Sequence, residues 1–261
     1  MAAVSRLRAC CPVCRTLTAV ALGPAYECHA CGGAFPAGLV RVPRAWGGGG
    51  EAMAEAARLE LPYPEAAVVA LDTLAEQTDV LAAGLPERPL ILGGCCCAHV
   101  GAIRGLARRG RRLGVVWLDA HGDLNTPETS PSGNAWGMPL RMLLDAGDVA
   151  PRDVPRVGAR ALDPPEDAFL TASEVRVGPE GVADALRDVD AIYVALDVDV
   201  LEPGPVACFM PEPGGLDLDE TEATLLDAVS RAPLAGIGLT GLMPDPASLP
   251  ALQRLLAAAG L

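Results

Sequence analysis

Apolar and polar positions alternate in a regular order from about residue 89 to the end of the chain. Five short apolar runs predict strands at residues 89–94, 113–123, 154–160, 191–200 and 234–242. Helical spacing of apolar residues predicts helices between and after them, at residues 98–109, 138–146, 180–188, 218–231 and 247–259. Continuous apolar strands that alternate with helices are typical of a parallel sheet covered on both faces. The pattern therefore predicts an α/β fold with a mostly parallel sheet.

The N-terminal part differs in composition, because it contains five cysteines followed by Gly and Pro. The segments "CPVC" and "CHAC" are two C-x-x-C motifs. Each motif turns two thiolates toward one ion, and two such motifs complete a tetrahedral zinc site. A closed site of this kind stabilises its module rather than catalysing a reaction. The expected ligands of this structural zinc are Cys11, Cys14, Cys28 and Cys31.

A glycine-rich segment, "WGGGGE" at residues 46–51, is interpreted as a flexible joint. Residues 51–83 are expected to be helical with a break at "LPYP", and no strand is predicted ahead of residue 88. The sequence thus predicts two domains, a zinc-ribbon-like module at residues 1–45 and an α/β domain at residues 46–261.

Composition narrows the class of protein. The formal net charge is −13, which argues against a nucleic-acid or anionic-membrane partner. All 20 basic residues are Arg, so chemistry through a lysine Schiff base is excluded. Neither a signal peptide nor an apolar run of membrane-spanning length is found. We therefore expect a cytoplasmic protein, whose nine cysteines are metal ligands or core residues rather than disulfides.

Acidic residues end two of the predicted strands. "WLDAHGD" places Asp119, His121 and Asp123 at alternating positions, and "ALDVDV" does the same with Asp197 and Asp199. Side chains two apart on a strand share a face, so these groups can converge at the carboxyl edge of the sheet. A bare cluster of four carboxylates would repel itself unless cations lay among them. Carboxylates with an imidazole suit a pair of divalent ions such as Mn²⁺.

These motifs resemble those of the ureohydrolase superfamily, which includes arginases and agmatinases. The resemblance rests on "DAHGDLNTPETSPSGNAWG", "LDVDVLEP" and the preceding "LGGCCCAH", and extends over residues 88–245. It implies a three-layer α/β/α fold, a binuclear metal centre and a small amino-acid-like substrate. It also implies a homo-oligomer, either a trimer or a hexamer.

The resemblance assigns a role to each charged residue at the strand ends. Asp119 and Asp197 match aspartates that bridge both metals. Asp123 would complete the shell of the first metal, and His121 and Asp199 would complete that of the second.

The three cysteines in "LGGCCCAH" stand where the family has Gly-Gly-Asp-His, whose His binds the first metal. Aligned without gaps, Cys95 replaces the Asp and Cys96 replaces the His. As a thiolate, Cys96 would favour zinc over manganese. His99, one helical turn later, is the alternative ligand.

Five residues match those with which the family holds an amino acid. Four of them match the loop that binds the α-carboxylate, and Asp163 matches the residue that reaches the α-amino group. The alternative is that the loop residues only shape the loop. The four loop residues are Asn125, Ser130, Ser132 and Asn134.

Two positions at the reacting end depart from the family. Trp136 stands in place of a proton-shuttling histidine, and Gly241 in place of an acid that pairs with the guanidinium. We expect a metal-dependent hydrolase of linear guanidino or amidino C–N bonds, acting on a modified, hydroxyarginine-like amino acid. Asp123 would accept a proton from the attacking water. The alternative is a catalytically inactive homologue that serves as a binding or assembly subunit.

Overall fold

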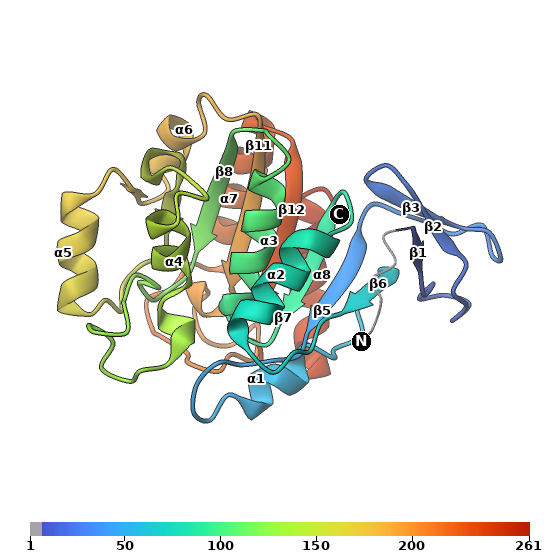
Figure 1. The fold of residues 1–261 in the computed structure, drawn as a ribbon, viewed down its shortest axis with the longest axis horizontal. Helices are drawn as coiled ribbons and strands as arrows, with labels where there is room; N and C mark the ends of the chain where they lie inside the picture. The colour runs from blue at the N-terminus through green and yellow to red at the C-terminus, as the bar shows by residue number, and fades with distance from the viewer. Residues whose placement is uncertain (1–6) are drawn as a thin grey trace.

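A computed structural model describes residues 7–261 and contains two sheets (Figure 1). The larger sheet has eight strands, all parallel, in the order β10-β9-β8-β11-β12-β7-β5-β6. Its strands are β5 (Gly38–Val42), β6 (Glu65–Val68), β7 (Pro89–Gly93), β8 (Leu113–Leu118), β9 (Pro155–Val157), β10 (Arg176–Val177), β11 (Ala191–Asp197) and β12 (Leu234–Thr240). The helices are α1 (Glu51–Ala56), α2 (Leu74–Gly84), α3 (Cys97–Ala107), α4 (Pro139–Asp145), α5 (Pro164–Ala172), α6 (Gly181–Ala185), α7 (Leu218–Arg231) and α8 (Leu249–Ala258).

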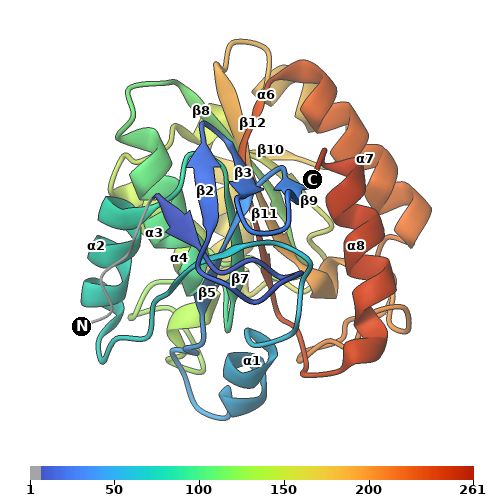
Figure 2. The same ribbon diagram turned by 90° about the vertical axis from the view of Figure 1, so that its right-hand side faces the viewer.

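Helices cover both faces of the larger sheet. Figure 2 shows α2 and α3 on one side of the strands and α7 and α8 on the other. The central strand β11 is buried along its whole length, and its side chains alternate between two cores. Ile192, Val194 and Leu196 face one core, whereas Tyr193 and Ala195 face the other. This alternation follows from the two-residue period of a strand, and the predicted three-layer α/β/α fold is confirmed.

The N-terminal module is a small antiparallel sheet of β1 (Arg8–Ala9), β2 (Ala19–Leu22), β3 (Ala25–Cys28) and β4 (Ala34–Phe35). Its own core is built around Tyr26, Cys11 and Cys28. The module joins the larger sheet at the outer edge of β6, where Cys10 and Glu65 exchange two backbone hydrogen bonds of 2.9 Å. The ribbon therefore lies against the edge of the α/β domain.

Two strands correct the predicted organisation. β5 begins at Gly38, inside the range predicted for the ribbon, yet pairs with β6 and β7 in the larger sheet. A strand therefore does precede residue 88. The short run Gly38–Val42 was not predicted because it follows the cysteines directly, and β6 was not predicted because its Ala-rich sequence has helical propensity.

The glycine-rich segment at residues 46–51 is not a joint between domains. It connects β5 to α1 and packs against the loop that carries Trp136. A Cβ at Gly47 or Gly50 would overlap or crowd the Trp136 ring, so the glycines allow a close approach of two segments.

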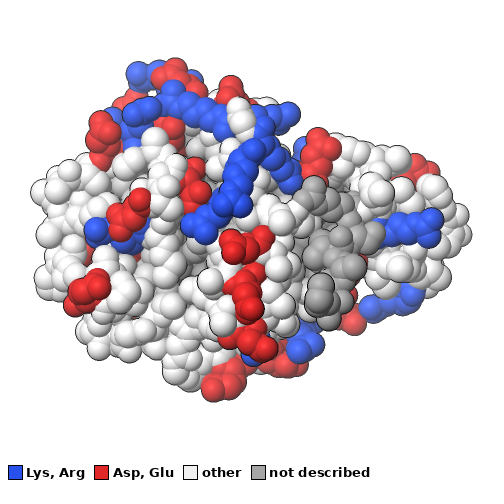
Figure 3. Space-filling model, viewed as in Figure 1, with Lys and Arg blue, Asp and Glu red and all other residues white. Residues whose placement is uncertain are grey.

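Charged side chains of both signs lie on the surface of the α/β domain. Figure 3 shows basic side chains across the top of one face, with acidic side chains among them. Within residues 7–261, no helix is both long enough and apolar enough to span a membrane.

Candidate metal centre

A cavity of about 500 Å³ opens at the carboxyl ends of the central strands. The turn after β7, the segments after β8 and β11, and the loop around residues 130–137 all contribute to its wall. This is where parallel sheets place binding sites, because the strands end there and the connecting loops diverge. At one end the cavity contains the charged residues that the sequence predicts to be metal ligands.

Cys96 lies at the start of α3, with its side chain turned into this charged cluster. Its Sγ donates to Asp197 Oδ2 at 2.9 Å and lies 3.9 Å from Asp119 Oδ2. Cys96, Asp119 and Asp123 place one ligand atom each within 4.8 Å of one another. The structure thus brings the predicted first-metal ligands together. Neighbouring Cys95 and Cys97 are also buried, in a small apolar cluster with Met53.

A second group forms beside the first and shares Asp119 with it. Its members are Asp119, His121 and Asp199. His121 Nδ1 lies 2.7 Å from Asp199 Oδ2 and 3.8 Å from Asp119 Oδ1. Asp197 lies between the two groups, since it accepts from Cys96 and its Oδ1 accepts the amide of Asp199 at 3.0 Å.

Asp123 is held in an unusual backbone conformation. Its φ is +54°, a region that costs a non-glycine residue free energy. The preceding Gly122 leaves space that the carboxylate of Glu166 fills, since a Cβ there would overlap it. Glu166 in turn accepts the amides of Leu124 at 3.0 Å and Asp163 at 2.9 Å. The hydrogen bonds of Glu166 therefore hold the strained turn at Asp123 in place.

One oxygen of Asp123 has no partner. Asp123 Oδ2 is buried, and no hydrogen bond reaches it from any described residue. A buried carboxylate oxygen without a donor is costly, and a cation is one group that would satisfy it. Oxygen, nitrogen and sulfur donors that converge on one point fit divalent metal ions.

Burial and mutual repulsion raise the pKa values of the clustered acids. Burial and the charge of Asp199 raise the pKa of Asp119 to about 7. Burial and the other aspartates raise the pKa of Asp123 well above its ordinary value, and burial together with Asp123 does the same for the Cys96 thiol. His121 differs: burial lowers its pKa, but its hydrogen bond to Asp199 and the charges of the surrounding aspartates together outweigh burial and raise the pKa to about 9. Such a cluster holds protons unless metal ions displace them.

His99 lies outside both groups. Its ring nitrogens are hydrogen-bonded to the hydroxyls of Tyr193 at 3.0 Å and Thr240 at 3.1 Å. Burial lowers the pKa of His99 to about 3, so the imidazole is neutral. Both nitrogens are therefore engaged in the core, which favours Cys96 over His99 as the ligand.

The predicted amino-acid loop is only partly at the cavity. Asn125 donates to Asp163 Oδ2 at 2.8 Å, and both residues line the cavity. Ser130 and Ser132 also line it, with their hydroxyls 3.4 Å apart. Asn134 does not, because its Oδ1 accepts the amide of Gly48 at 2.9 Å and fastens the glycine-rich segment instead.

Part of the cavity lining is apolar. The rings of Trp136 and Phe209 meet edge to face with centroids 6.0 Å apart, and Met53 and Met210 lie beside them on the wall. Gly241 also lines the cavity and has a φ of +71°. A Cβ at this position would overlap Asp197 Oδ1, so the backbone passes directly beside a proposed metal ligand.

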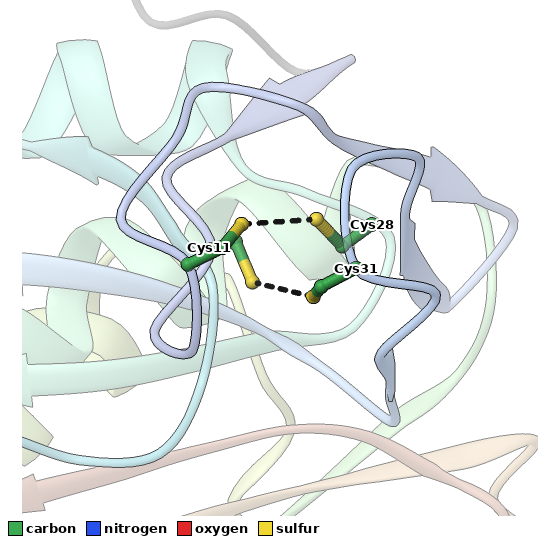
Figure 4. A group of neighbouring side chains, drawn as sticks. Cys11, Cys28 and Cys31 are labelled. Atoms are coloured by element: carbon green, nitrogen blue, oxygen red, sulfur yellow. Dashed lines mark hydrogen bonds between the residues drawn. The ribbon is translucent and has the colours of Figure 1, made fainter.

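The ribbon cysteines form a separate cluster. The sulfurs of Cys14 and Cys28 lie 3.5 Å apart, and those of Cys11 and Cys31 lie 3.7 Å apart. Figure 4 shows Cys11, Cys28 and Cys31 pointing toward one common space. Sulfurs about 2.3 Å from a tetrahedral zinc are separated by about 3.8 Å, so the spacing fits the ion.

Three residues at the centre were not predicted from the sequence. Glu212 approaches His121 Nε2 to 3.7 Å from a distant loop. Glu166 could have been found, because "DPPE" has the spacing of a capping box and the structure contains that box. Arg156 is fully buried on β9 and contacts the turn of residues 121–123. The sequence offers one signal for it, because an Arg stands within the apolar run "VPRV".

Comparison with known proteins gives consistent matches. A family model described as "Arginase family" matches residues 50–248. The arginase of Bacillus caldovelox is 35% identical over 188 residues, which cover 59% of this chain and 63% of that protein. The arginase of Bacillus subtilis (strain 168) is 34% identical over 163 residues, covering 52% and 55% of the two chains. The sequence matches thus span little more than half the length of these relatives.

The structural match to a solved arginase covers more of both chains than the sequence matches do. The native structure of the B. caldovelox arginase matches with a TM-score of 0.72 and 25% identity, covering 85% of this chain and 97% of that one.

Proposed function

This chain belongs to the arginase family, and we propose that it is a metal-dependent hydrolase of linear C–N bonds in guanidino or amidino amino acids. One observation supports this most directly. Asp123 Oδ2 is buried with no hydrogen-bond partner among residues 7–261, and Asp123 lies beside Cys96 and Asp119 at the charged end of a cavity large enough for an amino acid.

The proposed ligands divide between two ions. Cys96 and Asp123 would hold the first ion, whereas His121 and Asp199 would hold the second. Asp119 and Asp197 lie between them and would contact both. A pair of divalent ions, manganese or zinc, would lower the pKa of a water and polarise the carbon under attack.

The chain's own residues have three tasks. Asp123, one oxygen of which has no hydrogen-bond partner among residues 7–261, would accept the proton that the attacking water loses. Asn125 and Asp163 form one polar edge, where the α-amino group of an amino acid would be held. Ser130 and Ser132 provide hydroxyls for its carboxylate.

The apolar wall bears on the choice of substrate. Trp136 has an indole where the family has a proton shuttle, so it cannot deliver a proton to a strongly basic leaving amine. Gly241 offers no acid to a guanidinium cation. We therefore propose a modified, hydroxyarginine-like substrate rather than arginine itself, because an N-hydroxyguanidino group is a weaker base than a guanidino group and depends less on an acidic partner.

Trp136 and Gly241 also favour a second candidate function. Loss of a general acid or base costs a rate on the order of 10²–10⁴-fold, so a homologue with Trp136 can be catalytically inactive. In that case the chain would serve as a binding or assembly subunit, with the ribbon as its distinguishing module.

Metal content and a substrate panel separate these candidates. The protein is loaded with Mn²⁺ or Zn²⁺, and urea or amine release is measured from arginine, N-hydroxyarginine and a formimidoyl amino acid. The hydrolase predicts two ions per chain beyond the ribbon zinc and turnover of a modified substrate in preference to arginine. Full loading of the centre without turnover of any of these would favour the inactive homologue. A centre that takes up no ions would contradict both the ligand assignment and the hydrolase.

We further propose one structural zinc ion in the ribbon, held by Cys11, Cys14, Cys28 and Cys31. We also propose a cytoplasmic location and a homo-oligomer of three or six chains. Light scattering after size-exclusion chromatography tests the oligomer, and a monomeric mass would contradict it.

A further inference from the structure

We propose that Tyr193, His99 and Thr240 form a positioning relay, a chain of buried hydrogen bonds that fixes the carboxylate of Asp197 for metal binding. Thr240 donates to Asp197 Oδ2 at 3.0 Å, and the other two residues set the direction of that bond. The inference rests on the metal centre of the proposed function, because Asp197 lies between the two ion positions. It does not depend on which substrate is hydrolysed.

The relay is enclosed by the core of the larger domain. Tyr193 and Thr240 are completely buried, and His99 is only 1% exposed. Tyr193 lies on β11, Thr240 is the last residue of β12, and His99 lies in the first turn of α3. Polar groups at such depth cost free energy unless they are hydrogen-bonded, so each bond of the relay constrains its neighbours.

The hydrogen bonds of the relay all point in one direction. A carboxylate that binds metal is ionised and only accepts, so Thr240 must donate its single hydrogen to Asp197 and accept from His99 Nε2 at 3.1 Å. Burial lowers the pKa of His99 to about 3, so the imidazole is neutral and its one N–H is on Nε2. Nδ1 then accepts the hydroxyl hydrogen of Tyr193 at 3.0 Å. Every donor of the relay is thus directed toward Asp197.

Two neighbours hold the imidazole in this position. Gly238 on β12 leaves space for it, since a Cβ there would overlap the Tyr193 hydroxyl and the His99 ring. The Trp117 ring packs edge to face against His99, with centroids 5.4 Å apart. Trp117 Nε1 also donates to Asp119 Oδ2 at 3.3 Å. One buried cluster therefore contacts both carboxylates that lie between the ion positions.

The relay adds a constraint on Asp197 without adding a charge. Asp197 Oδ1 accepts the amide of Asp199 at 3.0 Å, so a donor on Oδ2 fixes the carboxylate plane at its second oxygen. Because all three residues of the relay are neutral, none of them repels a metal ion. Removing a hydrogen-bond partner of a metal ligand typically lowers metal affinity by about 10–100-fold. We therefore expect the relay to contribute to metal affinity as well as to stability.

Removal of the Thr240 hydroxyl tests this contribution. Thr240→Val keeps the shape of the side chain and deprives Asp197 Oδ2 of its donor. The affinity of the centre for Mn²⁺, measured by chelator competition with the ribbon zinc retained, should fall roughly tenfold. Thr240→Ser keeps the hydroxyl and should retain most of the affinity.

The matched control is the same substitution at another buried threonine. Thr221 on α7 donates to Asp217 O at 2.8 Å and makes no hydrogen bond to a proposed ligand. Thr221→Val should lower the melting temperature and leave the affinity for Mn²⁺ unchanged. A merely structural role of Thr240 would give the same result for Thr240→Val.

The tautomer of His99 provides a second test, which the native protein alone can supply if Thr240→Val does not fold. The chain has three histidines, so the imidazole nitrogens are readily assigned by NMR with the centre loaded with diamagnetic Zn²⁺. His99 should be the neutral Nε2–H tautomer. The Nδ1–H tautomer would require Thr240 to donate to His99 instead of Asp197.

The relay is overturned if Thr240→Val binds Mn²⁺ as tightly as the native protein, or if His99 is the Nδ1–H tautomer. Either result leaves the proposed function intact, because the native centre still binds its ions. A native centre that takes up no metal contradicts the proposed function itself, and the relay fails with it as a device for metal binding.

Discussion

The two cysteine-containing clusters of this chain differ in donors and in access. In the ribbon, four sulfurs surround one point and leave no position for another ligand. In the larger domain, one sulfur joins carboxylates and an imidazole beside a cavity of about 500 Å³, and one Asp123 oxygen has no partner in the described part of the chain. A closed cluster can only stabilise its module, whereas an open one can also admit a reactant. The setting of a cysteine, more than its presence, decides between these uses.

Removing a cysteine of the ribbon cluster should have the largest predicted effect on stability. Cys14→Ser removes one of four ligands, and a structural zinc contributes on the order of 10 kcal/mol to folding a module of this kind. We expect the zinc content to fall by about one ion per chain and residues 7–35 to become sensitive to protease, while the centre still binds Mn²⁺. Elemental analysis and limited proteolysis measure both effects. Unchanged zinc content in the variant would falsify the ribbon assignment.

A substitution at the centre should remove its metal ions and leave the ribbon zinc in place. Asp197→Asn removes a charge from the carboxylate between both ion positions. The affinity of the centre for Mn²⁺ should fall on the order of 10³-fold, since loss of mere supporting residues already costs about 10–100-fold. Chelator competition measures the affinity, and one zinc per chain should remain. A crystal of the native protein grown with excess metal, with no ion bound to these side chains, would also contradict the centre.

The stability of the protein with an empty centre should fall as the pH rises. The pKa of Asp119 is raised from 3.8 to about 7, and that of His121 from 6.5 to about 9. Both groups bind protons more tightly when folded, so their contribution to stability is present at low pH and is lost as the pH rises through these values. The emptied protein should lose roughly 5 °C in melting temperature between pH 5 and pH 8 because of Asp119. Asp119→Asn should lose less over the same range, and an equal or steeper loss would contradict this origin.

The smallest predicted effect concerns metal preference. Cys96→His exchanges a thiolate for an imidazole, so the ratio of Mn²⁺ to Zn²⁺ affinity at the centre should rise by about tenfold. His99→Ala should leave this ratio unchanged, because His99 is hydrogen-bonded to Tyr193 and Thr240. Metal titration of both variants under reducing conditions measures the ratio. If His99→Ala empties the centre and Cys96→His has no effect, the ligand is misassigned.

Long periodic segments were predicted well from the sequence, and short ones were not. The helix predicted at residues 218–231 coincides with α7, whose start is marked by the capping box of Asp217 and Glu220. The strand β11 is equally clear because all of its residues are apolar until Asp197. In contrast, β5 and β6 have only five and four residues, and their structure depends on pairing, of β5 with β7 and of β6 with β5.

Convergence at the centre could be predicted from residue types, whereas of its supports only Glu166 had a clear local signal, the capping-box spacing of "DPPE". Asp119, His121 and Asp123 follow the carboxyl end of β8, where parallel sheets place binding sites, although none of them lies within the strand itself. The left-handed backbone of Asp123 and the buried charge of Arg156 depend on neighbours far away in the sequence. No local pattern encodes such contacts.

Gly241 limits how this protein can change by mutation. Any side chain there meets two obstacles, a left-handed backbone and the carboxylate of Asp197. An acid cannot be introduced at this position alone, because the first substitution would displace a proposed metal ligand before any new contact formed. The loss of that acid is consequently difficult to reverse in evolution one residue at a time. Engineering an arginine-type pocket into this chain would require transplanting the whole segment around Gly241 together with its partners.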